Sequence, residues 1–256
     1  MQAIVDAIIQ GDLVCIQNKI NQGLDVNTPI DVPGRTMGRT MLSEASRLNK
    51  KTIVEELLRQ PLINVNQSTN NGTSPLYVSC YYGNIDIVRL LLQRPELDVN
   101  YNYYMTSLMI TCHMFCDQQN DTIFNIIQLL LEHPDIDMNI EFTPDNKIAL
   151  GFLIDTIQQT SRKDKKRKLK NAVMLFVQRA NNTTLAQWTQ RYAAQQWFVD
   201  ILVEEGRRRR DLVAQRRTLQ QAQTPKQTVL TLPADVHIHI RDMIPIQLKN
   251  KTSLKF

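Results

Sequence analysis

A short segment recurs three times along the chain. The segment "RQPLINVN" ends at Asn66, "QRPELDVN" ends at Asn100 and "EHPDIDMN" ends at Asn139. Self-similarity at intervals of a few tens of residues indicates that one structural unit is copied and that neighbouring copies stack to bury a shared core. We therefore expect a repeat architecture.

Two of the copies align over their whole length. They begin at Gly38 and Gly72, which are 34 residues apart. In the second of them, Ser74-Pro75 is typical of a helix start, and Gly83-Asn84 interrupts the helix. The segment "IDIVRLLLQR" then has apolar residues on one helical face and ends before Pro95. Each copy is therefore predicted to be a pair of short helices.

The outer copies are less regular. The first shows only its second half clearly, as "GDLVCIQNKINQGLDVN", and the fourth carries a short insertion around "CDQQNDT". A fifth, degenerate copy is predicted from two apolar segments, "TPDNKIALGFLIDTI" and "LKNAVMLFVQRAN". The basic stretch "QQTSRKDKKRKLK" between them is expected to be a solvated extension or loop. Terminal repeats are usually atypical because one face meets water or another domain.

These copies resemble ankyrin repeats, whose period is about 33 residues. The stretch from Gly72 to Tyr77 matches the G-x-T-P-L-H start of that family, Gly83-Asn84 matches its inter-helix glycine, and "LDVN" matches its closing hairpin entry. Three copies depart from the family pattern, because Pro61, Pro95 and Pro134 replace the glycine of its usual ending. The resemblance covers roughly residues 1–140 and implies an all-α solenoid of about five repeats in residues 1–182, with a helical extension in 183–256.

The resemblance also implies a binding surface. Ankyrin solenoids bind proteins through hairpin tips and the outer residues of each first helix. Carried over to this chain, the predicted contact residues are Arg39, Arg47, Asn71, Tyr81, Tyr82, Tyr103, Met105, His113 and Met114. Tyr and Arg are enriched at binding hot spots, and exposed aromatic residues are unusual on a surface meant for water. The alternative is that some of these side chains pack against the insertion at 116–122.

The segment 183–223 lacks proline and is rich in Ala, Gln, Glu and Arg. Its apolar residues recur at helical spacing, from Leu185 and Trp188 onward. We predict one or two helices here, with Gly206 as a break or kink, and expect them to be able to cap the last repeat.

The segment "LPADVHIHIRDMI" resembles the opening of an F-box, whose helix docks on the Skp adaptor of a ubiquitin ligase. The adaptor contacts implied by that resemblance are Leu232, Pro233, Val236, Ile240 and Ile244. Ankyrin repeats followed by such a segment resemble poxvirus ankyrin proteins and some intracellular bacterial effectors. An F-box needs about 40–50 residues, and this segment is shorter. The alternative is that Pro233 and Asp235 cap a short helix that packs on the preceding one.

The charge is divided unevenly along the chain. Residues 1–159 hold 10 Lys and Arg against 18 Asp and Glu, whereas residues 160–256 hold 20 against 7. The basic runs at 162–170 and 207–210 suggest nuclear localisation signals or nucleic-acid contacts, although neither run has aromatic residues interleaved for base stacking. The alternatives are solvated helix faces or electrostatic contact with an acidic protein surface.

Catalytic and metal motifs are weak in this sequence. It contains neither phosphate-loop pattern, and no Ser or Cys lies in a nucleophile elbow. Cys112, His113 and Cys116 could suggest zinc, but Cys112 aligns with Cys80 at a small buried repeat position, so packing explains it. We expect no metal, no cofactor and no enzyme activity.

The four cysteines suit free thiols in a reducing compartment, and the amino-terminal segment has no basic region typical of a signal peptide. No stretch is long and apolar enough for a membrane span. We expect a cytoplasmic protein, or one in the host cytoplasm or nucleus if it is an effector. The leading hypothesis is a protein-interaction module, with an adaptor for ubiquitin-ligase machinery as its sharpest form and a nuclear or nucleic-acid factor as the alternative.

Overall fold

The computed structural model describes residues 2–32, 35–101, 104–142 and 146–223. The chain divides into two compact units, Met1–Gly206 and Arg207–Phe256. The helices are α1 (Gln2–Gln10), α2 (Leu13–Asn21), α3 (Met41–Arg47), α4 (Lys51–Leu58), α5 (Pro75–Tyr81), α6 (Ile85–Leu92), α7 (Ser107–Gln118), α8 (Asp121–Glu132), α9 (Ala149–Gln159), α10 (Lys163–Arg179), α11 (Asn182–Arg191) and α12 (Gln196–Gln223). Among these residues, no helix is long and apolar enough to cross a membrane.

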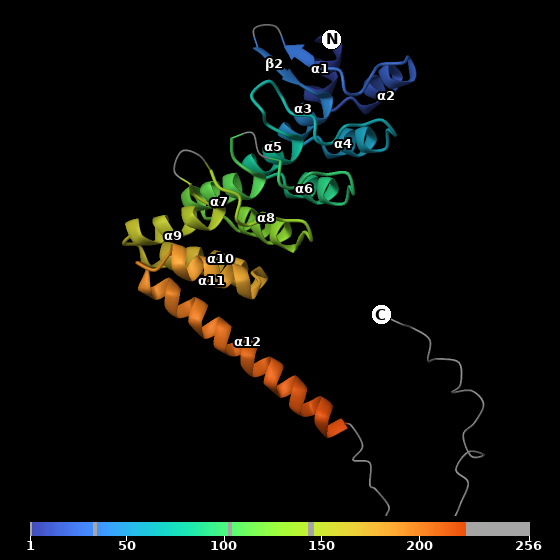
Figure 1. Ribbon diagram of the computed structural model, residues 1–256. Coiled ribbons are helices and arrows are strands. Elements are labelled where there is room, and N and C mark those ends of the chain that lie inside the picture. The colour runs from blue at the N-terminus through green and yellow to red at the C-terminus, as the bar shows by residue number, and fades with distance from the viewer. Residues whose placement is uncertain (1, 33–34, 102–103, 143–145, 224–256) are drawn as a thin grey trace, which may run out of the picture. The chain divides into compact units, whose positions relative to one another are not determined.

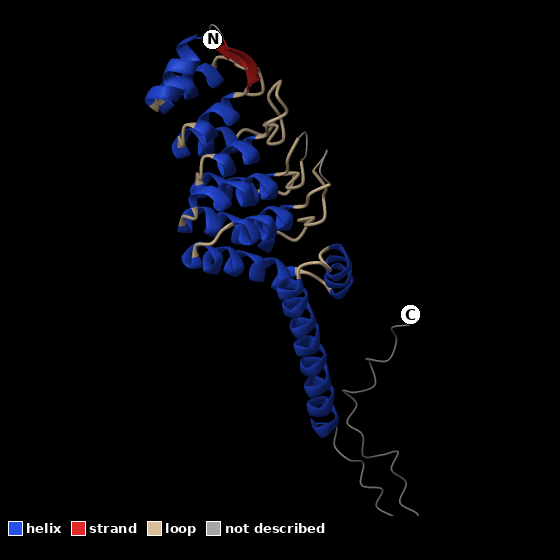
Figure 2. Ribbon diagram, turned by 90° about the vertical axis from the view of Figure 1, so that its left-hand side faces the viewer, coloured by secondary structure: helices blue, strands red, loops and turns tan. Residues whose placement is uncertain are grey.

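Consecutive helices in the first unit pair and stack in two columns (Figure 1). One column holds the first helix of each pair, from α1 to α9, and we call these the inner helices. The second helices, from α2 to α10, form the outer column. Neighbours contact within each column as well as within each pair. The loops between pairs project together beyond the ends of the inner helices (Figure 2). The predicted all-α stack of helix pairs is confirmed, and α1 supplies the first helix that was unclear in copy one.

The same local signals start the inner helices in the central copies. Thr40, Ser74 and Thr106 each cap an inner helix, accepting a hydrogen bond from the backbone N–H three residues later. Such caps satisfy donors that have no partner within the helix. The turn to the outer helix then needs a left-handed residue. Gly83 supplies it at φ 71°, whereas Asn49 and Gln119 adopt that conformation in the neighbouring copies.

The stack buries a continuous apolar core because each helix pair covers the face of the next. Ile53, Ile87 and Ile126 on three successive outer helices are fully buried. The insertion in the fourth copy lengthens α7 and α8 to 12 residues each, against 7 for α5 and 8 for α6. The insertion therefore extends the helices of that copy.

The loop between the first two copies forms a small β-hairpin, which the sequence analysis did not predict. Strand β1 (Ile30–Val32) pairs antiparallel with β2 (Arg35–Arg39). Gly38 in β2 has φ 58°, and a Cβ atom there would collide with the Asn70 side chain. This glycine therefore allows the loops before the second and third copies to approach closely.

The last residue of each recurring segment joins one copy to the next. The side-chain amide of Asn66 donates to the Glu96 carbonyl at 2.7 Å, and its oxygen accepts from the Asp98 N–H at 2.8 Å. Asn27 bonds Leu62 and Asn64 in the same way, and Asn100 bonds Asp135 and Asp137. The recurrence of this asparagine thus has a structural cause.

In the fifth helix pair, the structure differs from the prediction for the basic stretch. Residues 163–170 form the first half of α10, whereas a loop or extension was expected. Most of these residues are exposed, while Leu169, Val173 and Phe176 on the same helix are fully buried. The apolar residues form the buried face of the helix, so the lysines and arginines lie on its solvent-exposed face. Nucleic-acid binding by this run stays a prediction.

The helices α11 and α12 follow the fifth pair, as the sequence analysis predicted for one or two helices. Trp188 of α11 is 1% exposed, and its indole N–H donates to the Asn139 side-chain oxygen at 2.9 Å. Gly206 lies within α12, so the break predicted there is wrong, while the alternative of a kink stays a prediction. The predicted adaptor contacts at 232–244 lie outside the described residues.

Candidate functional site

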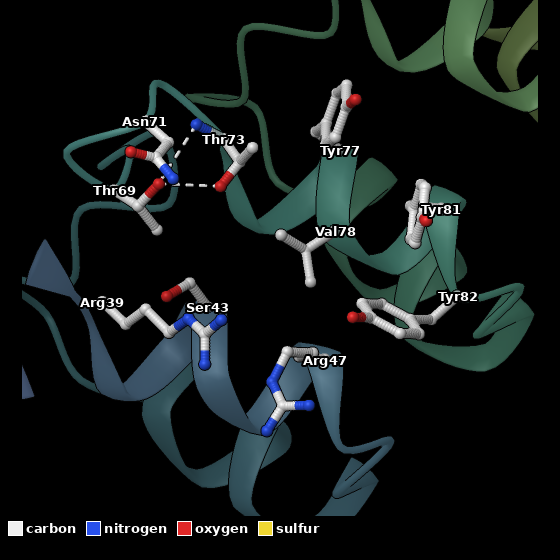
Figure 3. A pocket seen from close by; sticks show the side chains of 10 residues that line it. All are labelled: Arg39, Ser43, Arg47, Thr69, Asn71, Thr73, Tyr77, Val78, Tyr81 and Tyr82. Atoms are coloured by element: carbon white, nitrogen blue, oxygen red, sulfur yellow. Dashed lines mark hydrogen bonds between the residues drawn. The ribbon is translucent and has the colours of Figure 1, made fainter. Parts of the chain in front are cut away.

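A hollow of about 270 Å³ opens between the second and third copies (Figure 3). Its walls come from β2, from α3, from the loop before α5 and from α5 itself. The residues that line it are Arg39, Ser43, Arg47, Thr69, Asn71, Thr73, Tyr77, Val78, Tyr81 and Tyr82. Five of the predicted contact residues therefore lie together: Arg39, Arg47, Asn71, Tyr81 and Tyr82.

The two arginines share one buried carboxylate. Glu44 of α3 is 2% exposed, and its side chain accepts from Arg47 Nε at 2.9 Å, Arg47 Nη2 at 2.5 Å and Arg39 Nη1 at 3.1 Å. Burial acts to raise the pKa of Glu44, but the hydrogen bonds and charges of Arg47 and Arg39 outweigh it and lower that pKa. Glu44 therefore stays ionised and orients both guanidinium groups at the edge of the hollow.

Arg47 also interacts with the aromatic wall. Its pKa is raised chiefly by the hydrogen bond to Glu44, with a smaller contribution from the Tyr82 hydroxyl. The rings of Tyr81 and Tyr82 meet edge to face at a centroid distance of 5.0 Å. Their exposed fractions are 42% and 52%, so both rings remain largely open to a ligand.

A second hollow adjoins the first. It is lined by Asn70, Asn71, Gly72, Thr73, Tyr77, Tyr104 and Met105, and it shares Asn71, Thr73 and Tyr77 with the first. Tyr104 is 64% exposed, and its ring packs edge to face on Phe142 at 4.8 Å. The charged hollow therefore continues into an uncharged, aromatic one toward the fourth copy.

The remaining predicted contact residues fall elsewhere. Met105 is 9% exposed and belongs to the core, and it also lines the second hollow, so its predicted role as a contact stays a prediction. His113 is exposed, and its ring meets Phe152 of α9 at 5.7 Å, so it packs on the fifth copy. Met114 is half-buried against the core. Tyr103 lies outside the described residues.

Sequence reasoning missed Glu44, Tyr77 and Tyr104. Glu44 lies three residues before Arg47 on one helix, a spacing that favours an ion pair and could have been noticed. Tyr77 occupies the repeat position that Ser43 occupies one copy earlier, so the residue type at this position differs between the two copies. Tyr104 adjoins the predicted Tyr103 in the sequence.

Three of the four cysteines, Cys80, Cys112 and Cys116, are buried. Burial raises the pKa of Cys80 to about 12 and that of Cys116 to about 11, and it raises the pKa of Cys112 as well. Cys116 donates to the Phe152 carbonyl at 3.3 Å. Among the described residues, no group of three or more potential metal ligands comes together.

Comparison with known proteins agrees with this geometry. A family model described as ankyrin repeats, in three copies, matches residues 4–103. A search of curated proteins finds no match. Ankyrin repeats are modules of protein–protein interaction, and the match indicates no catalytic family. Residues 4–103 are therefore similar to ankyrin repeats, and the helix pairs that follow them continue the same all-α stack.

Proposed function

We propose that the chain is a non-enzymatic module that binds a protein partner across the inner face of its second, third and fourth copies. The observation that carries the proposal is the gathering of exposed aromatic side chains there. Within the described residues, the exposed Phe, Trp or Tyr side chains are Tyr81, Tyr82 and Tyr104. Every other described Phe, Trp or Tyr is at least half-buried.

The chemistry of this face suits protein recognition. Tyrosine offers a large apolar surface and a polar tip, and arginine offers several donors, so both residue types are common among binding hot spots. The stack holds the backbone rigid, because α3, α5 and α7 pack directly on one another. A preorganised face of this kind loses little conformational entropy on binding.

Affinity capture with the full chain and matched variants tests this proposal. We expect a set of captured proteins that disappears when Tyr81 and Tyr82 are both changed to alanine. The control is Leu62→Ala, which removes a side chain that is 81% exposed and lies in the loop after α4. Capture that is equally strong from the tyrosine variant and the control would contradict the proposed face.

A finer form of the proposal adds an adaptor role. The F-box-like segment would join the captured protein to ubiquitin-ligase machinery through Leu232, Pro233, Val236, Ile240 and Ile244. Its support is the sequence resemblance alone, because these residues lie outside the described part of the chain. The test is a pull-down of a Skp-type adaptor. Recovery that is lost on combining Leu232→Ala with Ile240→Ala supports the role, and recovery unaffected by those changes rejects it.

A further inference from the structure

We propose that the outer surface of α10 binds the phosphate backbone of double-stranded DNA without reading the base sequence. The contact residues are four cations of the first half of this helix, which we call the basic stripe: Lys163, Lys166, Arg167 and Lys170. The stripe lies in the outer column, whereas the proposed protein-binding face lies on the inner helices. The inference therefore does not depend on the proposed function.

The helix geometry gathers the stripe on one side of α10. Its members lie three, four and seven residues after the first, a spacing that places side chains on the same face of a helix. Leu169 and the apolar residues that follow it are buried in the stack and fix the rotation of the helix. Lys163, Arg167 and Lys170 are exposed, and Lys166 is partly exposed. The cations are thus held on a packed helix that faces solvent.

The protein itself compensates the stripe poorly. In the described part of the chain, Lys163, Lys166 and Lys170 form no ion pair. Arg167 has a distant partner, since its Nη2 atom lies 3.9 Å from Asp164 Oδ1 and both side chains are largely exposed. Such exposed pairs contribute little. The Nζ atom of Lys170 lies 5.3 Å from the centre of a tryptophan ring, which orients the charge without cancelling it.

The position of the stripe on the helix adds a second observation. The amino-terminal end of a helix carries a partial positive charge, so cations in the first turns are unfavourable there. Like charges three and four residues apart repel one another as well. The N-cap residue, Arg162, accepts no side-chain capping bond that would offset this. The stripe therefore does not stabilise α10, and an external polyanion would relieve the repulsion.

The charge density favours DNA over an acidic protein segment. The stripe spans seven residue steps of 1.5 Å, or about 10 Å. Over that length a DNA duplex presents about six phosphate charges, at one per roughly 1.7 Å of its axis. An extended acidic peptide advances about 3.4 Å per residue and therefore presents about three. Four closely spaced cations match the denser polyanion better.

Other polyanions suit the stripe less well. Membrane-surface helices insert an apolar face, but the apolar face of α10 is buried in the stack. Single strands are bound by stacking their bases on aromatic side chains, and the stripe contains none. The nearby ring, that of Trp197, is half-buried and lies beneath Lys170. Protein domains that recognise duplex RNA span about 16 base pairs, far more than about 10 Å.

Fluorescence anisotropy of the full-length chain with a labelled DNA duplex of about 20 base pairs tests the inference. We expect binding at about 0.05 M salt that weakens steeply as salt is raised, with similar affinity for duplexes of unrelated sequence. Changing Lys163, Lys166 and Lys170 together to glutamine should weaken binding at least about tenfold. It should also lower the slope of log K against log salt by about three, because each lost phosphate contact removes about one.

A matched variant controls for net charge. Changing Lys51, Arg59 and Arg89 to glutamine removes three exposed cations from the outer column of the second and third copies. Its salt slope should equal that of the wild type. Circular dichroism controls for folding, and the stripe variant should unfold at a urea concentration no lower than the wild type, because its substitutions remove repulsion at a helix start.

The remaining outcomes identify the ligand and the surface. No binding at about 0.05 M salt, or an equal loss in the stripe variant and its control, would overturn the inference. Tighter binding of an RNA duplex or a single strand of the same length would overturn the assignment to duplex DNA, as would equal competition by polyglutamate at the same charge concentration. Changing Tyr81 and Tyr82 to alanine should leave DNA binding unchanged, and a loss there would move the contact to the inner face and reject the stripe.

Discussion

The middle of the stack and its last helix pair use the same repeat design with opposite results. Between α3 and α5, the inner face is hollowed, charged and aromatic, and Tyr81 and Tyr82 are exposed there. After α10, the helix α11 brings Trp188 to within 6.4 Å of the Phe176 ring and buries both side chains almost completely. The middle therefore leaves polar and aromatic groups exposed, whereas the end covers its apolar surface with the chain's own next helix.

The recurring asparagine shows how the two regions diverge. Asn100 bonds the backbone of the following loop, at Asp135 and Asp137. Asn139 occupies the same repeat position, but its side-chain oxygen accepts from the indole of Trp188. The asparagine at this repeat position therefore has a different hydrogen-bond partner where a different structural element follows it. The comparison suggests that α11 serves as the cap of the stack.

Removing the cap should have the largest effect. Trp188→Ala deletes a fully buried aromatic side chain and should lower the free energy of unfolding by about 3–5 kcal/mol. Chemical denaturation followed by circular dichroism measures the loss. Trp188→Phe keeps most of the apolar contact and removes the donor to Asn139, so it should cost less. Equal losses for the two variants would mean that the hydrogen bond dominates the contact.

Removing the buried carboxylate in the middle should cost less. Glu44→Gln leaves Arg39 and Arg47 without their shared anion, and we expect a loss of about 1–3 kcal/mol at neutral pH, reduced by the partial exposure of both arginines. Urea denaturation of the variant and of Glu56→Gln, a matched change in the outer-column pair with Arg59, measures the difference. A smaller loss for Glu44→Gln than for Glu56→Gln would contradict the structural role of Glu44.

The pH dependence follows from the lowered pKa of Glu44. A carboxyl whose pKa is lower in the folded state stabilises the fold above the ordinary glutamate pKa of about 4.3. That stabilisation is lost as the pH falls through the folded-state pKa. The stability gap between the wild type and Glu44→Gln should therefore narrow below about pH 4.3. A gap that stays constant down to the acid transition would contradict the lowered pKa.

Breaking one link between copies should have a smaller effect. Asn100→Ala removes two side-chain-to-backbone hydrogen bonds in an exposed loop and should cost about 1–2 kcal/mol. Asn139→Ala should cost about as much, although its partner is a side chain in the cap. Combining Asn139→Ala with Trp188→Phe should then cost little more than either change alone, because both remove the same bond. Simple additivity would show that the two residues act independently.

The smallest expected effect concerns the reactivity of individual cysteines, which thiol labelling measures. Cys15 is partly exposed, while Cys80, Cys112 and Cys116 are buried in the third and fourth copies. Because burial raises the pKa of Cys80 to about 12, its reactive thiolate is scarce at neutral pH. We expect one fast-reacting thiol in the native protein and all four after unfolding, measured with a chromogenic disulfide reagent. More than one fast thiol would show that the stack opens locally.

Much of the fold could be predicted because local signals recur. Ser74-Pro75 starts a helix, Gly83 turns it, and the apolar spacing in "IVRLLL" defines a buried face. Where such signals were weak, prediction failed. The run at 163–170 reads as solvated and is indeed mostly exposed, but it is helical because Leu169 and Val173 anchor the same helix in the core. Gly206 remains helical because a single glycine costs only about 1 kcal/mol there.

The candidate site could be predicted only in part. The positions that differ between copies pointed to Arg39, Arg47 and Tyr82, and these three residues line one hollow in the structure. Their role as contacts stays a prediction. The burial of Met105 and the carboxylate of Glu44 could not be foreseen, because both depend on how adjacent copies pack.

The sequence by itself determined the unit, its period and the residues by which one copy differs from the next, since helix caps, turns and apolar spacing act over a few residues. Only the tertiary structure decided what those differences build. Arg39 comes from a hairpin, Arg47 from α3 and Tyr82 from the end of α5, and stacking alone brings them to one hollow. It also decided where the repeats end, because the partner of Asn139 lies 49 residues away, on the helix that closes the stack.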